Sequence, residues 1–173
     1  MNDQIIGIDP GLEGGIAILN NGQIRFEPIP RDKIDKKEVD CIKLYSLFKE
    51  AFDSSSKTAV FIEYQHAFPG QGTISTARIV SEYKTIYTAA KIASGLSQNI
   101  AGIFPVSPIT WQRHIYDAAE IKDRTAGKLR SINAFKRLIS EQIPQIGKKK
   151  LRPHLGLIEA GLIAKYGEII IKT

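Results

Sequence analysis

The alternation of hydrophobic and polar residues predicts three short strands at the start of the chain. QIIGIDPG (4–11) is almost continuously apolar up to its Asp-Pro-Gly end, which is typical of a strand covered on both faces. GGIAILNNGQIRFEPI (14–29) contains two strands joined at Asn21-Gly22, the strongest short signal for a hairpin. We therefore expect three consecutive strands that pair in antiparallel fashion.

After these three strands, the sequence predicts a helix and two further strands. Residues 36–52 carry apolar side chains at intervals that share one helix face. TAVFIEY (58–64) and NIAGIFPV (99–106) predict a fourth and a fifth strand, the latter stopped by Pro105. Further helices are expected at 75–94, from Pro108 through Trp111, at 122–142, and at 153–166 with Gly167 as the stop. The pattern predicts one α/β domain spanning residues 1–173.

Length and composition narrow the class of protein. The chain has 173 residues, 43% hydrophobic and 24% charged, as in ordinary globular domains. No apolar run approaches the roughly 20 residues of a membrane span, and no signal-peptide pattern opens the chain. Cys41 is the single cysteine, which excludes an internal disulfide. We expect a cytoplasmic protein with no membrane partner and no small-molecule cofactor.

Positive charge is concentrated in one part of the chain. The formal net charge is +6, and the segment 113–152 holds eleven Lys and Arg against four Asp and Glu, a surplus of seven. Such a segment is typical of a solvated helix face followed by a basic loop. It also suits a nucleic-acid surface, because neutralising phosphates releases counterions and drives binding. Charge alone leaves both interpretations open.

Carboxylates stand in unusual places. Asp9 and Glu63 each end a strand expected to be buried, where an ionised group is costly without a partner. Acids on neighbouring strands can converge on a divalent cation, which removes that cost. The last helix offers His154 and Glu159, the latter inside the apolar stretch LGLIEAGLIA. The alternatives are a solvent-facing Glu159 at a helix edge and an exposed His154 that only begins the helix.

Four segments resemble the RuvC-type Holliday junction resolvases, most closely their phage and prophage branch. They are IIGIDPGLEGGIAIL, FIEYQHAFPGQG, VSPITWQRHI and LRPHLGLIEAGLIAKYG, in family order along nearly the whole chain. The resemblance implies a ribonuclease H-like fold, in which helices flank a five-stranded mixed sheet of three antiparallel and then two parallel strands. It also implies a homodimeric endonuclease that cuts four-way DNA junctions with Mg²⁺ or Mn²⁺.

The same resemblance assigns the site. Asp9, Glu63, His154 and Glu159 would be the catalytic residues and would hold two metal ions. The sequence departs from the family at His154, where close relatives commonly carry an acid in the pattern D-x-G-x-A-E-A. Mg²⁺ prefers hard oxygen ligands, so an imidazole here would tilt the preference toward Mn²⁺.

The resemblance also suggests which residues contact DNA. Lys148, Lys149, Lys150 and Arg152 precede the last helix and are expected to contact phosphates. His66 and Phe68 follow Glu63, and an aromatic near this place would pack against bases at the crossover. Phe68 could equally be a loop anchor in the core, and we expect Trp111 to be a packing residue.

Two other functions fit the same motifs. One is a different ribonuclease H-like nuclease that acts on flaps, forks or RNA–DNA hybrids. The other is a branched-DNA-binding protein that has lost catalysis, which the missing acid at His154 favours. An apolar stripe on the helix at 75–94 suits either a dimer interface or core packing.

Overall fold

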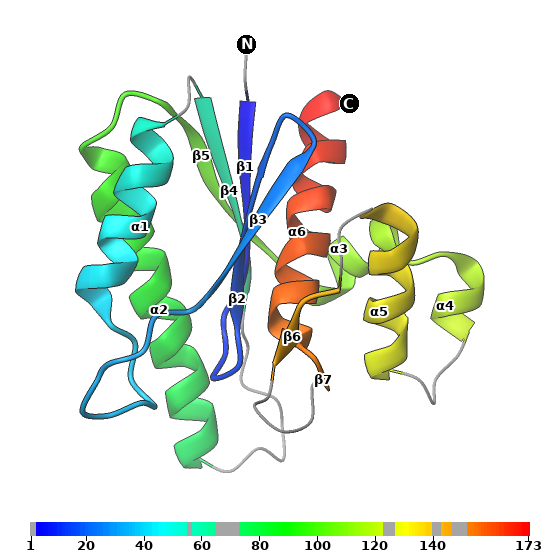
Figure 1. Ribbon diagram of the computed structural model, residues 1–173, viewed down its shortest axis with the longest axis horizontal. Coiled ribbons are helices and arrows are strands. Elements are labelled where there is room, and N and C mark those ends of the chain that lie inside the picture. Colours follow the sequence, from blue (N-terminus) through cyan, green and yellow to red (C-terminus); the bar gives the residue numbers. More distant parts are fainter. Residues whose placement is uncertain (1–2, 55–56, 65–72, 123–126, 140–142, 147–151) are drawn as a thin grey trace.

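A five-stranded mixed sheet forms the centre of the molecule (Figure 1). The computed structural model describes residues 3–54, 57–64, 73–122, 127–139, 143–146 and 152–173. The strands lie in the order β3-β2-β1-β4-β5. Their bounds are β1 Asp3–Asp9, β2 Gly15–Asn20, β3 Gln23–Pro28, β4 Lys57–Glu63 and β5 Ile100–Val106.

Strand directions follow the expected pattern. β2 is antiparallel to both β1 and β3, whereas β4 runs parallel to β1 and β5 parallel to β4. The hairpin turns at Asn21 and Gly22, which both have positive φ, as a tight two-residue turn requires. The sequence prediction of three antiparallel strands followed by two parallel ones is thus confirmed.

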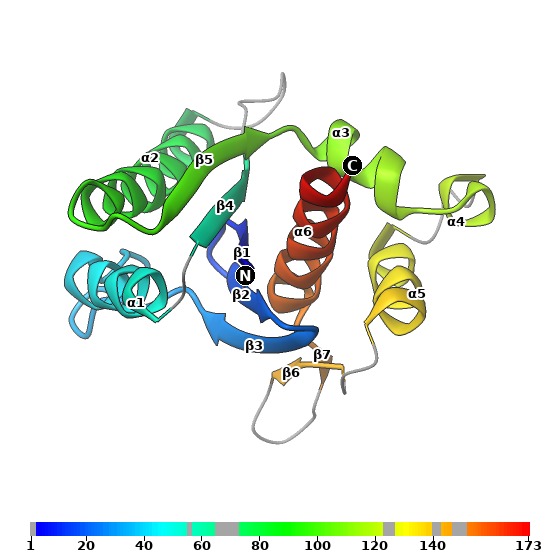
Figure 2. The same ribbon diagram turned by 90° about the horizontal axis from the view of Figure 1, so that it is seen from above.

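Helices cover both faces of the sheet, so that each face has its own apolar core (Figure 2). α1 and α2 cover one face, and α6 covers the other with α3, α4 and α5 outside it. Ile6 and Ile8 of β1 are buried on the first side and Ile5 on the second, which explains the continuous apolar strand. The bounds are α1 Cys41–Asp53, α2 Thr73–Gly95, α3 Pro108–Ile115, α4 Ala118–Lys122, α5 Gly127–Leu138 and α6 Leu155–Lys172.

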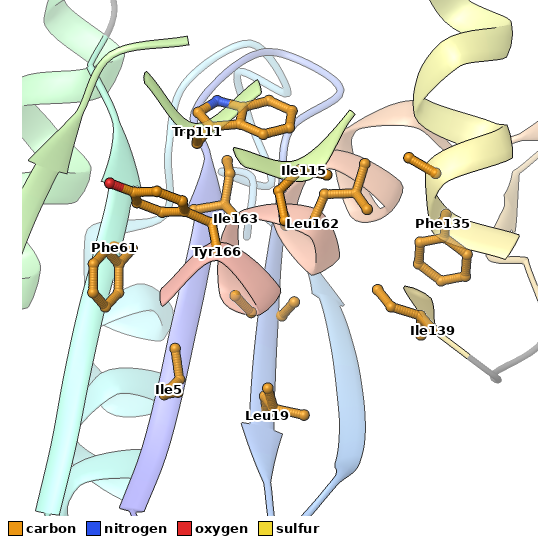
Figure 3. Packing of buried hydrophobic residues seen from close by; sticks show 14 of the residues in the cluster. Ile5, Leu19, Phe61, Trp111, Ile115, Phe135, Ile139, Leu162, Ile163 and Tyr166 are labelled. Carbon is orange, nitrogen blue, oxygen red and sulfur yellow. The ribbon is translucent and has the colours of Figure 1, made fainter. Parts of the chain in front are cut away.

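The core under α6 is aromatic and aliphatic (Figure 3). Trp111 of α3 is fully buried, with Leu162 and Ile163 of α6 in the same cluster. Tyr166 packs edge-on against Phe61 of β4, with 5.8 Å between ring centroids. This core joins the outer helices to the sheet through α6.

The bounds of two helices differ from the sequence prediction. α1 begins at Cys41 rather than near residue 36, because the Asp40 side chain caps it by accepting from the Lys43 N–H. Within the expected helix at 122–142 the structure describes α5, which begins at Gly127 and ends at Leu138, while the short α4 before it is capped by Asp117. A two-stranded ribbon, β6 Gln145–Ile146 and β7 Arg152–Pro153, follows them.

Gly167 does not end the last helix, which continues to Lys172. A Cβ at Gly167 would lie 2.5 Å from the Phe61 ring and 2.9 Å from Ile5. The glycine therefore allows α6 to approach the sheet rather than serving as a C-cap. Within the described part of the chain, no helix is both long and apolar enough to cross a bilayer.

Candidate active site

Three acidic side chains from distant parts of the sequence share one site. Asp9 ends β1 and Glu63 ends β4, and these parallel neighbours terminate at the same edge of the sheet. Glu159 comes from the second turn of α6, which lies across β1 and β2. Of the four residues expected to share the site, Glu63 and Glu159 lie near enough to Asp9 for their charges to act on it.

Glycines let α6 approach β1 closely enough for this. A Cβ at Gly7 would lie 2.2 Å from the Ala160 carbonyl oxygen and 2.3 Å from the Ala164 nitrogen. A Cβ at Gly156 would lie 1.9 Å from the Glu13 carbonyl oxygen. Backbone therefore contacts backbone directly on both sides of Glu159, and this fixes its place beside the end of β1.

Negative charge accumulates at Asp9. The pKa of Asp9 is well above its usual value, first because of burial and then because of the charges of Glu159, Glu63 and Glu82. Every one of these influences raises the pKa, and no described cation or hydrogen-bond donor offsets them. Glu82 itself forms a buried ion pair with Arg31, which also donates to the Gly11 carbonyl oxygen in the loop after Asp9. The uncompensated charge thus lies on the site's own carboxylates.

Glu63 is held by the indole of α3. The side chain of Glu63 is 8% exposed, and Trp111 Nε1 donates a hydrogen bond to its Oε2 at 2.7 Å. Trp111 was expected only to pack in the core, and it does pack there, but its N–H also reaches the site. A buried indole N–H usually has an acceptor, so the sequence did contain a signal for this contact.

Glu159 is held by a two-step hydrogen-bond relay. Ser131 Oγ donates to Glu159 Oε1 at 2.8 Å and lies 2.9 Å from the Tyr116 hydroxyl. Since the one serine proton goes to Glu159, the tyrosine hydroxyl must donate to Ser131. Burial, the largest influence, raises the pKa of Tyr116 to about 12, so the tyrosine stays a donor at neutral pH. Sequence reasoning missed Ser131 and Tyr116, because no motif marks them.

Burial also raises the pKa of Glu159, while the hydrogen bond from Ser131 acts in the opposite direction. Burial therefore outweighs the one donor that stabilises the ionised form. In the metal-free site, burial therefore disfavours the ionised forms of both Glu159 and Asp9.

His154 lies at the start of α6 and is buried, at 6% exposure. Its Nδ1 accepts from the Leu157 N–H at 3.3 Å, so His154 is the N-cap. A neutral ring whose Nδ1 accepts carries its proton on Nε2, which then has no lone pair for a metal. The neighbouring charges that shift its pKa are Glu13 and Arg152, not the site carboxylates. In this arrangement His154 stands apart from the three acids.

Substitution of His154 separates a capping role from a ligand role. Asparagine is a good N-cap, so His154→Asn should retain stability and Mn²⁺ affinity, whereas His154→Ala should lose about 1 kcal/mol of stability. Burial lowers the pKa of His154, so the folded protein should lose stability as pH falls below about 6.5, the usual histidine value. That loss should be absent from His154→Asn. Urea unfolding and calorimetric Mn²⁺ titration measure both effects, and a tenfold weaker Mn²⁺ affinity of His154→Asn would instead identify a ligand.

The expected DNA contacts are only partly within the described residues. His66, Phe68, Lys148, Lys149 and Lys150 lie outside them. Arg152 is exposed in β7 and forms an ion pair with Glu13, 2.6 Å from Nη2 to Oε1. Both side chains are more than half exposed, and such pairs contribute little, so Arg152 can exchange Glu13 for a phosphate.

The donor set suits a hard divalent cation. Among the described residues, no group of three or more His, Cys, Asp or Glu side chains is arranged to hold a metal ion as it stands. Burial and the charges of Glu159, Glu63 and Glu82 raise the pKa of Asp9, and carboxylate oxygens are the ligands that Mg²⁺ prefers. The donor chemistry of these residues therefore suits such a cation.

No protein-family model matches the sequence, and no curated protein sequence matches it. Solved structures do resemble the fold. RuvC of T. thermophilus in complex with a Holliday junction substrate has a TM-score of 0.57 at 12% identity, covering 98% of this chain and 95% of that one. A second Thermus thermophilus RuvC structure gives 0.56 at 14% identity, covering 96% of both.

The yeast mitochondrial Holliday junction resolvase Ydc2 gives a TM-score of 0.48 at 10% identity, covering 94% of this chain and 76% of that one. Identities this low establish architecture and nothing finer. The strand order, the strand directions and the two RuvC structures together show that this chain has the ribonuclease H-like fold of RuvC.

Proposed function

We propose that this protein is a divalent-metal-dependent endonuclease that cuts four-way DNA junctions. The observation that carries the proposal is the meeting of Asp9, Glu63 and Glu159, from β1, β4 and α6, with no described cation to offset Asp9. The fold supports it, since a RuvC of the same fold has been solved with a Holliday junction substrate.

The chemistry is hydrolysis of a phosphodiester bond. Bound Mg²⁺ or Mn²⁺ would supply Lewis acidity and an activated water at neutral pH. The resemblance to the RuvC-type resolvases implies that two ions would share Asp9, with Glu63 and Glu159 as further ligands. Trp111 and Ser131 hold these two carboxylates at the edge of the sheet. Water would displace the 3′-oxygen, leaving a 5′-phosphate and a 3′-hydroxyl.

Exposed cations near the site suit the phosphate backbone. Arg113 of α3 and Lys128 and Lys136 of α5 are exposed, on the helices that also provide Trp111 and Ser131. Arg152 is exposed beside the loop that follows Asp9. Phosphates bound at these side chains would lead a strand toward the carboxylates.

A two-fold dimer would match a junction that is cut in two strands. The groove between α1 and α2 supports this, with a cavity of about 770 Å³ lined largely by apolar side chains. Ile42 and Ile92 on its rim are 79% and 56% exposed. A second copy of the chain that covers this groove would bury these exposed apolar side chains.

One observation favours a second candidate, a branched-DNA-binding protein without catalysis. The described His, Cys, Asp and Glu side chains do not form a ready metal site, and His154 serves as a helix cap where relatives carry an acid. Such a protein would keep the basic surface and lose hydrolysis.

A cleavage assay on a synthetic four-way junction tests the proposal. With Mg²⁺ or Mn²⁺, we expect paired symmetric nicks in two strands of like polarity, with ends that DNA ligase can reseal. Linear duplex, a flap, a fork and an RNA–DNA hybrid of the same sequence serve as controls. Light scattering on the free and junction-bound protein gives the oligomeric state.

Each outcome points to one function. Equal rates on duplex or hybrid would contradict junction specificity and indicate a different ribonuclease H-like nuclease. Junction binding without cleavage in either metal would support the non-catalytic protein. A monomer in both states would exclude paired cutting by a dimer.

A further inference from the structure

Two hydrogen bonds reach the site from helices outside the sheet. The geometry points to Trp111 and Ser131 as positioning residues that fix the carboxylates of Glu63 and Glu159 for metal binding. This inference rests on the proposed function, since it concerns the same site. It assigns to the helices α3 and α5 a part in metal affinity that is separate from their contribution to the core.

The position of Trp111 is set by the ends of β4 and β5, beside which α3 begins. Glu63 and Val106 are paired as the last residues of β4 and β5, and α3 follows β5 at once. Ser107 caps α3 and Pro108 occupies its first turn, so the helix begins at a fixed place. The indole is fully buried and packs against the Tyr116 ring at 5.6 Å between centroids. It therefore has little freedom to leave Glu63.

The contact itself has the character of a bond to a charged group. The distance from Trp111 Nε1 to Glu63 Oε2 is 2.7 Å, whereas neutral N–H···O bonds usually measure about 2.9–3.0 Å. Short bonds of this kind are typical of an ionised acceptor. The indole thus fixes the rotation of the carboxylate and stabilises its ionised form.

Ser131 does the same for Glu159 from α5. It is 1% exposed and packed between α5 and α6, with its hydroxyl committed to Glu159 and the Tyr116 hydroxyl behind it. The hydrogen bond to Glu63 and the relay to Glu159 are connected, because the Tyr116 ring packs against the Trp111 ring. One buried network therefore holds two of the three acids.

The ligand geometry needs such support because the acids repel one another. Glu63 and Glu159 both raise the pKa of Asp9, so without fixed donors each carboxylate would rotate away in the metal-free protein. Outer hydrogen-bond partners of metal ligands typically contribute about 10–100-fold in metal affinity. We expect an effect of this size from each of the two residues.

Trp111 is the one tryptophan in the chain, so tryptophan emission reports on the surroundings of this indole, which include the Glu63 carboxylate. Mg²⁺ titration of the full-length wild-type protein should change the emission saturably, and Glu63→Gln should abolish the change. By calorimetry, Trp111→Phe and Ser131→Ala should each bind Mg²⁺ about 10–100-fold more weakly. Activity should recover in both variants as Mg²⁺ is raised toward saturation.

Ile115→Val is the matched control, because Ile115 is buried in the same helix and makes no polar contact with its side chain. It should lower stability and leave Mg²⁺ affinity within twofold of wild type. Trp111→Phe with unchanged Mg²⁺ affinity would overturn the positioning role while leaving the proposed function intact. No saturable Mg²⁺ binding by the wild type would overturn the proposed function and, with it, this inference.

Discussion

Asp9→Asn should reduce junction cleavage by at least about a thousandfold while it raises the thermal stability of the metal-free protein. In the proposed function the carboxylate would contribute several kcal/mol through bound metal ions, and each 1.4 kcal/mol is tenfold in rate. The same charge is unfavourable without metal, because burial and three neighbouring acids oppose it. Asparagine retains the size and removes the charge.

The stability that Asp9→Asn gains over the wild type should increase with pH. The folded pKa of Asp9 lies above its ordinary value of about 4, so ionisation favours the unfolded chain. The destabilisation is absent below that ordinary value, grows as pH rises toward the folded pKa, and is complete above it. Melting curves in EDTA should therefore converge for wild type and Asp9→Asn at low pH and separate at neutral pH.

Each kcal/mol of destabilisation that Asp9→Asn removes should raise Tm by about 2–4 °C in a chain of this length. Asp53→Asn is the control, since Asp53 is an exposed partner of Lys49 on α1 and should change Tm little. A neutral-pH Tm of Asp9→Asn at or below that of the wild type would contradict the picture of uncompensated charge. Near-normal cleavage by Asp9→Asn would remove Asp9 from the site.

Gly7→Ala should destabilise the fold by about 3 kcal/mol or more, at the upper end of overpacking effects. The new Cβ would meet only backbone atoms of α6, 2.2 Å from the Ala160 oxygen and 2.3 Å from the Ala164 nitrogen. No side chain can rotate away, so the helix itself must shift. Urea unfolding should show the loss, with a fall in Tm of roughly 6–12 °C.

The shift should also weaken Mg²⁺ binding, because Ala160 directly follows Glu159 and the two move together. Gly127→Ala is the matched control, since no atom of the described residues lies within 4 Å of a Cβ added at the start of α5. We expect its stability to stay within about 0.5 kcal/mol of wild type. If Gly7→Ala were as stable as Gly127→Ala, the close contact between β1 and α6 could not be what orders the site.

Local patterns were sufficient to predict the sheet and two of its acids. Continuous apolar runs and Asn21-Gly22 specify strands and a hairpin, and strand ends necessarily place Asp9 and Glu63 at an edge. Periodicity reports which face is buried, not which atom a buried side chain meets. For that reason Trp111 was predicted to be buried but not to bond Glu63.

Other features depend on contacts between distant segments. The bond from Ser131 to Glu159 joins α5 to α6, and no spacing within either helix indicates it. Gly167 resembled a helix stop, yet its role is set by Phe61 on another element. The burial of His154 likewise depends on the tertiary structure around the start of α6, which sequence alone did not suggest.

The backbone contact between β1 and α6 also determines how these two elements can separate when the fold opens locally. Side chains at most helix–sheet contacts can rearrange by degrees, but Gly7 of β1 lies directly against the backbone of α6 at Ala160 and Ala164. α6 must therefore separate from β1 as a unit, and their slowest amide protons should exchange through a shared opening. In the opened form Glu159 is separated from Asp9, so the proposed nuclease site would exist only while this one unit stays closed.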